Sequence, residues 1–122
     1  MSNYRNLNFL FTFLLLMVAM SAIAAAPKRE FYEIKIYHLK NADQEARVEA
    51  FLKDAYVPAA HRAGIKNVGV FKPVATDTMA GKLIYVLTPI KSLDQLLTLP
   101  KTLDKDAAYA SAGKDYIEAN YK

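Results

Sequence analysis

The side chains best suited to chemistry in this chain are two histidines and three tyrosines. His38 follows Tyr37 near the end of an alternating apolar segment, His61 lies near the end of an amphipathic one together with Tyr56, and Tyr85 lies in a third apolar run. A histidine can act as an acid or a base because its ordinary pKa is about 6.5. Tyr37, His38, Tyr85 and His61, with Tyr56 as a weaker addition, are therefore candidates to orient a small apolar ligand.

Each candidate also has a structural interpretation, which the sequence favours. A histidine at the end of a strand, such as His38, commonly bonds to the backbone. His61 lies where a helix dipole favours the protonated imidazole. Tyrosines with an apolar body and a polar tip are ordinary core or interface residues. The same choice between an aromatic ligand cage and simple packing applies to Tyr32, Tyr85, Tyr109 and Tyr116.

Other kinds of site are disfavoured by the residues present. The chain has no cysteine, which excludes disulfides, thiol catalysis and thiolate metal ligands. Ser92 and Ser111 lack the histidine context and glycine frame of a hydrolase nucleophile. Asp104 and Asp106 are interpreted as charges favoured by a helix start, and the oxygens of residues 76–78 are too few to specify a cation. We predict no catalytic residue, no metal site and no cofactor.

The N-terminal segment has the pattern of a secretory signal. Arg5 precedes the uncharged apolar run of residues 9–20, and small residues follow it. Ala22 and Ala24 occupy the positions where a signal peptidase needs small side chains, so residues 1–24 are predicted to be removed and the rest exported to the periplasm or medium. The alternative is an uncleaved membrane anchor, because the apolar stretch approaches the roughly 18 to 20 residues that span a bilayer.

The charge pattern argues against nucleic-acid binding. The chain carries 16 Lys and Arg against 12 Asp and Glu, a net charge of +4. The basic residues are scattered among acidic ones, whereas a nucleic-acid binder gathers them on one stripe. Contact with a membrane is expected only through the signal segment, if that segment stays uncleaved.

Residues 31–39 alternate with the period of a half-buried strand. One face carries Tyr32, Ile34, Ile36 and His38, and the other carries Glu33, Lys35 and Tyr37. We expect the first face to be buried against the apolar stripe of the following helix. Replacing Ile36 or Phe51 by Ala is then expected to cost about 2 to 5 kcal/mol of stability.

A helix is predicted to follow directly. Asn41 can cap it and Gln44 can complete a capping box. Its apolar stripe begins at Val48, Pro58 should bend its last turn, and Gly64 supplies a left-handed stop.

The remaining chain predicts a hairpin and more helix. Residues 68–71 and 83–87 are expected to form two antiparallel strands joined by a polar loop. Ser92 opens a short helix that Pro100 is expected to end, and a looser helical period runs over residues 103–121.

These elements predict one α+β domain over residues 27–122, a ferredoxin-like unit in the order β-α-β-β-α whose fourth strand is missing. A partner chain completes the sheet, or the C-terminal helix is the true end, or the chain is the leading piece of a longer protein. The last alternative is slightly favoured, because no closing signal follows Tyr121.

The mature chain resembles the NIPSNAP family over nearly its whole length. The resemblance rests on residues 32–39 (YEIKIYHL), 56–64 (YVPAAHRAG), 68–71 (VGVF) and 83–87 (LIYVL), the last running into 92–94 (SLD). It implies a unit of the dimeric α-β barrel type, in which two sheets face each other across a shared cavity. Members commonly carry two such units, so a single unit without its fourth strand departs from the pattern.

Together the residues and the resemblance predict an exported domain that binds a small apolar molecule or acts in assembly. Its expected partner is a second copy or a second NIPSNAP-like unit, met through the sheet. The alternative is an enzyme of the cofactor-independent oxygenase or isomerase kind that uses His38 or Tyr37 in the barrel.

Overall fold

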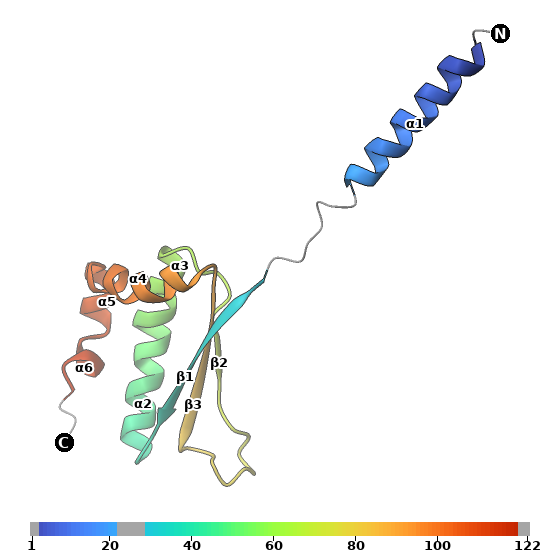
Figure 1. Ribbon diagram of the computed structural model, residues 1–122. Helices are drawn as coiled ribbons and strands as arrows, with labels where there is room; N and C mark the ends of the chain where they lie inside the picture. The colour runs from blue at the N-terminus through green and yellow to red at the C-terminus, as the bar shows by residue number, and fades with distance from the viewer. Residues whose placement is uncertain (1–2, 22–28, 120–122) are drawn as a thin grey trace.

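The computed structural model describes residues 3–21 and 29–119 of the chain. Helix α1 (Asn3–Ser21) stands apart from the other elements in Figure 1, and large apolar side chains in its first part, such as Phe9 at 76%, are exposed. Within these residues, no helix is both long and apolar enough to cross a membrane. The cleavage position predicted after Ala24 lies outside the described residues.

The rest forms an α+β domain, as expected. Three antiparallel strands make the sheet: β1 (Phe31–His38), β2 (Gly69–Phe71) and β3 (Leu83–Ile90). Their order is β1-β3-β2. Leu87 of the central strand lies between Ile34 of β1 and Gly69 of β2. The predicted hairpin is confirmed, and its second strand runs three residues further than expected.

The helices gather on one side of this sheet (Figure 1). They are α2 (Ala42–Phe51), η2 (Leu52–Tyr56), α3 (Val57–Arg62), α4 (Leu93–Asp104), α5 (Ala107–Ala112) and α6 (Lys114–Ile117). The first three follow one another without a break, and η2 is a wider, π-helical turn between two α-helical segments.

The start and end of the first helical run are confirmed. The Asn41 side chain accepts a hydrogen bond from the Gln44 backbone at 2.9 Å, and Gln44 reaches back to the backbone N–H of Lys40 at 2.8 Å. Gly64 ends the run with φ at +90°, a backbone conformation that residues with a side chain rarely adopt. The wide turn of η2 lies just before Pro58, which has no N–H to give to the regular ladder.

The face of β1 turned toward the helices is the opposite of the one predicted. Ile34 and Ile36 are 62% and 49% exposed, whereas Glu33, Lys35 and Tyr37 are half-buried beneath the helices. The long aliphatic stems of Glu and Lys can cover apolar surface while their charged ends stay together, so these residues tolerate the inner position. The alternation was predicted correctly and its direction was wrong.

One prediction for the C-terminal part is also wrong. Helix α4 does not end at Pro100, which lies inside it. The helix continues because Leu99 and Leu103 are both 5% exposed and hold its last turns against the core. The helical stretch predicted over residues 103–121 is confirmed in part: residues 103–104 end α4, and two short helices, α5 and α6, follow and meet at Gly113. Residues 120–122 lie outside the described residues.

The core lies between the helices and the inner face of β3. On that face Ile84, Val86 and Thr88 are fully buried. They pack against the first helical run, where Phe51, predicted to be a core residue, is 5% exposed. Thr88 meets the Tyr56 hydroxyl at 2.9 Å, which satisfies the polar atoms of both side chains.

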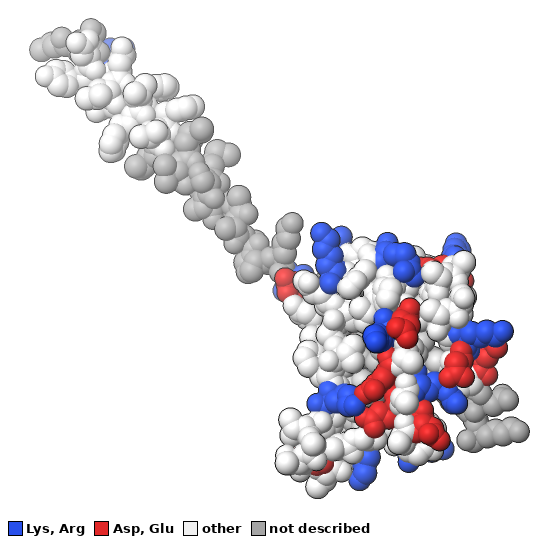
Figure 2. Space-filling model, turned by 180° about the vertical axis from the view of Figure 1, so that it is seen from behind, with Lys and Arg blue, Asp and Glu red and all other residues white. Residues whose placement is uncertain are grey.

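Ion pairs between acidic and basic side chains connect the exposed parts of these elements. Lys72 lies between Glu45 and Glu49, and Arg62 meets Asp106 at 2.7 Å. Figure 2 shows acidic and basic side chains lying side by side on the face in view. Charges of opposite sign are therefore mixed on this face. That the chain does not bind nucleic acid stays a prediction.

Candidate functional site

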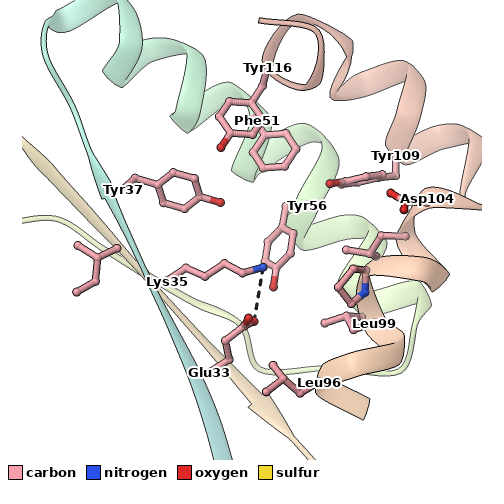
Figure 3. Close-up of a pocket in the computed structure, with 13 residues that line it drawn as sticks. Glu33, Lys35, Tyr37, Phe51, Tyr56, Leu96, Leu99, Asp104, Tyr109 and Tyr116 are labelled. Carbon is pink, nitrogen blue, oxygen red and sulfur yellow. Dashed lines mark ion pairs between the residues drawn. The ribbon is translucent and has the colours of Figure 1, made fainter. Parts of the chain in front are cut away.

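A cavity of about 450 Å³ lies between the inner face of β1 and the helices. Figure 3 shows side chains from both layers pointing into it. Strand β1 contributes Glu33, Lys35, Ile36 and Tyr37, and the helices contribute Phe51, Tyr56, Leu96, Leu99, Pro100, Leu103, Asp104, Tyr109 and Tyr116. Its size is within the range of small-molecule sites, and its lining mixes apolar, aromatic and charged groups. We call it the inner cavity.

The charged centre of the inner cavity is a pair on one strand. The Lys35 Nζ and Glu33 Oε2 atoms are 3.6 Å apart, and the ammonium also lies 5.0 Å from the centre of the Tyr56 ring. Among the described residues, Glu33 Oε2 has no hydrogen-bond donor although it is shielded from solvent. An oxygen in this state is costly unless another group donates to it.

The wall opposite β1 is aromatic. The Phe51 and Tyr116 rings stack with their centres 4.1 Å apart, and Tyr109 meets the edge of Phe51 at 5.9 Å. Tyr37 approaches Tyr116 edge to face at 6.2 Å. These contacts tie α5 and α6 to the first helical run and to β1, because each ring belongs to a different element.

Burial keeps two phenols of the inner cavity, one on β1 and one on α5, in the neutral form. It raises the pKa of Tyr37 to about 12, with a smaller contribution from Tyr56. Burial likewise raises the pKa of the Tyr109 hydroxyl, and Asp104 adds to the effect. Both phenols are therefore neutral at physiological pH and can donate hydrogen bonds into the cavity.

The other face of the sheet is apolar and, apart from the buried Leu83, at least partly exposed; we call it the outer face. Its β1 residues Tyr32, Ile34 and Ile36 are 51%, 62% and 49% exposed, and Phe71 of β2 is 55% exposed. Half-buried Tyr85, Leu87 and Pro89 of β3 lie between them. At one end, where Tyr32, Leu87 and Pro89 lie, the surface is hollowed into a groove of about 800 Å³.

The structure separates the four predicted ligand-binding residues. Tyr37 lines the inner cavity, whereas Tyr85 and the exposed His38 belong to the outer face. His61 is exposed on α3, in its last turn. Because neighbours on a strand point to opposite faces, Tyr37 and His38 cannot act together on one ligand bound to one face.

The tyrosines considered as a cage divide in the same way. Tyr109 and Tyr116 line the inner cavity, and Tyr32 and Tyr85 lie on the outer face. Asp106 is an N-cap that accepts a hydrogen bond from the Tyr109 backbone at 3.0 Å, whereas Asp104 lines the cavity. No group of His, Asp and Glu side chains suited to a metal ion occurs among the described residues.

Sequence reasoning missed Glu33 and Lys35 as cavity residues. They were placed on the solvent face of β1 because they are charged, and the apolar side chains beside them indicated the opposite burial. The one available signal was that both strand faces are partly apolar, since Tyr37 shares the face of Glu33 and Lys35.

The chain matches no protein-family model, no curated protein and no solved structure. The geometry of the inner cavity and the outer face therefore carries the functional argument.

Proposed function

We propose that this chain is an exported assembly module: a ferredoxin-like, NIPSNAP-type unit that forms a homodimer through the outer face of its sheet. The observation that carries the proposal is the exposure of Ile34, Ile36 and Phe71 on a sheet whose other face is covered by helices. An antiparallel sheet with one face in water normally turns polar side chains to that side. An apolar outer face is instead typical of an interaction surface.

The strand order supports the ferredoxin-like assignment. β3 runs antiparallel to both of its neighbours, and the connections after β1 and β3 are helical and lie on one side. Over the described residues 29–119, these elements agree with the first five of a split β-α-β-β-α-β unit, whose sixth element would pair with the outer edge of β1.

The lack of formal charge on the outer face favours a second copy as its occupant. The outward positions of the three strands are Tyr32, Ile34, Ile36, His38, Gly69, Phe71, Leu83, Tyr85, Leu87 and Pro89. None of these is an acid, a lysine or an arginine. Charged residues, namely Arg29, Glu30, Lys66 and Lys91, line the groove at one end of the face. Away from that groove, two such faces can meet without burying like charges, and their aromatic rings are typical of interface cores.

The available area sets the expected strength of the dimer. Two strands of eight residues and one of three, at about 3.3 Å for each residue and spaced about 4.8 Å apart, give the sheet a face of roughly 300 Å². A standard interface covers about 800 Å² on each partner, so the sheet alone supplies less than half. We therefore expect a reversible dimer with a dissociation constant on the order of micromolar.

Sedimentation equilibrium of the full chain in an uncharged maltoside detergent tests the proposal. The native chain should self-associate reversibly, and Ile34→Glu should weaken association at least tenfold because it places a charge in the apolar contact. Lys53→Glu introduces the same side chain at an exposed helical position and should leave the dimer intact. A native chain that stays monomeric at about 100 µM, two orders above the expected constant, contradicts the proposal. So does an Ile34→Glu variant that dimerises normally.

A further inference from the structure

The inner cavity lies on the side of the sheet that dimerisation leaves free. It is enclosed by β1, the first helical run and α4 to α6, whereas the proposed contact uses the outer face. A ligand in this cavity would therefore be bound by each copy independently. The residues that would bind it are different from those of the proposed dimer contact.

The charges around the inner cavity leave an excess of one negative charge. Glu33 and Asp104 line it, and Lys35 is the basic residue among its lining side chains. The Lys35 ammonium is 3.6 Å from Glu33 Oε2, beyond the usual length of a hydrogen bond. The Glu33 Oε2 atom is therefore attracted by the Lys35 charge but accepts no hydrogen bond from any described residue.

The aromatic wall has the composition that attracts a cation. Five rings line the inner cavity: Tyr37, Phe51, Tyr56, Tyr109 and Tyr116. The faces of such rings carry partial negative charge, and a cation within about 6 Å of a ring centre is stabilised by it. Lys35 already shows this behaviour, with its ammonium 5.0 Å from the centre of the Tyr56 ring.

We infer that the inner cavity binds a small organic amine, with its ammonium group donating to Glu33 and its apolar or aromatic body against the rings and α4. The body would contact Leu96, Leu99 and Leu103, which form the apolar side of the cavity. The ammonium would supply the donor that Glu33 Oε2 lacks and would balance the charge of Asp104. An anion is disfavoured, because Lys35 is already engaged by Glu33 and Tyr56 and two carboxylates would repel it.

Three probes of nearly equal shape test this assignment: 2-phenylethylamine, 2-phenylethanol and phenylacetate. They share one ring and differ in charge, so the neutral alcohol reports the apolar contribution alone. Binding to the full chain is followed by the NMR shifts of labelled tyrosine rings in maltoside, which has no charge to compete. We expect the amine to bind at least tenfold more tightly than the alcohol, and phenylacetate to bind least.

Variants separate the role of the carboxylates from general packing. Glu33→Gln should remove most of the tenfold preference for the amine while leaving alcohol binding unchanged. Asp104→Asn, at an exposed position, should weaken the amine severalfold even if Glu33→Gln fails to fold. Asp54→Asn is the matched control, since it neutralises an exposed carboxylate outside the cavity lining.

The outcomes are distinct from those of the dimer experiment. Equal affinity for all three probes, tighter binding of phenylacetate, or no shift of the cavity tyrosines would each overturn the assignment of an amine site. The titration is repeated on the Ile34→Glu chain, whose substitution lies on the outer face. We expect the Ile34→Glu chain to retain its preference for the amine, whether that chain is a monomer or a dimer.

Discussion

Tyr37 shows how the helical cover changes the chemistry of a single side chain. Burial raises the pKa of its phenol to about 12, because the charged form would lose its hydration beneath α6 and the first helical run. The folded pKa lies above the unfolded value of 10.0, so the neutral phenol favours the folded state below pH 10. That contribution is lost as the pH rises from 10 through about 12.

We predict that a tyrosinate absorbance titration of the native chain contains a late component near pH 12 that Tyr37→Phe removes. The substitution keeps the ring and deletes only the hydroxyl, so the fold should persist. Tyr4→Phe is the control, because that side chain is 75% exposed on α1 and its loss should leave the late component intact. A late component of unchanged amplitude in Tyr37→Phe would show that this phenol is not buried.

The reversed face of β1 gives a second prediction at the scale of residues. Phe51→Ala should cost about 3 to 5 kcal/mol because it empties a position in the packed core. Ile36→Ala should cost less than about 1 kcal/mol, since half of that side chain is already in water and little cavity is left behind. Urea unfolding at concentrations below those of dimerisation measures both values. Equal costs for the two variants would support the burial first expected from the sequence.

The sequence predicted the alternation of β1 but not which side faces the core. Ile34 and Ile36 are apolar and therefore indicate burial. The sequence of one chain does not tell whether an apolar residue is buried in the core or in an interface between two copies. Glu33 and Lys35 indicate solvent by their charge, yet they are placed inward as a pair, with their stems against rings from helices distant in the sequence. Local patterns define a period, and the layers packed on a strand decide its direction.

At the scale of elements, short-range signals were reliable and the proline signal was not. The caps at Asn41 and Ser92 depend on contacts three residues away, and both are present. Pro100 was expected to stop α4, because proline removes a helical hydrogen bond. The burial of Leu99 and Leu103 on either side offsets that loss, and such burial depends on the tertiary structure.

Pro100→Ala should therefore stabilise the domain. The variant restores the N–H to a helix that the core already holds in place, and proline in a helix interior costs about 3 kcal/mol relative to alanine. Without the proline the unfolded chain has more conformational freedom, which lowers the free energy of unfolding by about 0.4 to 1 kcal/mol. The expected net increase in the free energy of unfolding is therefore about 2 kcal/mol. Chemical unfolding followed by circular dichroism measures the gain. Lower stability of the variant would mean that the proline ring itself contributes to packing at the inner cavity.

At the scale of the whole molecule, the sheet separates two surfaces with different properties. The residues of the inner cavity, from Glu33 to Tyr116, come from six elements, and no sequence spacing connects them. The outer face is assembled from three strands whose register brings Ile36, Tyr85 and Phe71 into one row. The order of elements predicted the sheet and its covering helices, whereas both candidate sites depend on which face the helices cover.

Export is the last prediction at this scale, and it concerns α1. This helix exposes Phe9, Leu10 and Phe11 by 76%, 71% and 68%, and such an apolar surface suits a segment recognised by the secretion machinery. We expect the exported chain to begin at Ala25, as N-terminal sequencing or intact mass would show. Ala24→Phe should block processing, because position 24 must be small for cleavage after either Ala24 or Ala26. Val74→Phe adds the same bulk far from the cleavage position and should be processed normally. Recovery of the native chain at full length in the membrane fraction would instead identify residues 1–24 as an anchor.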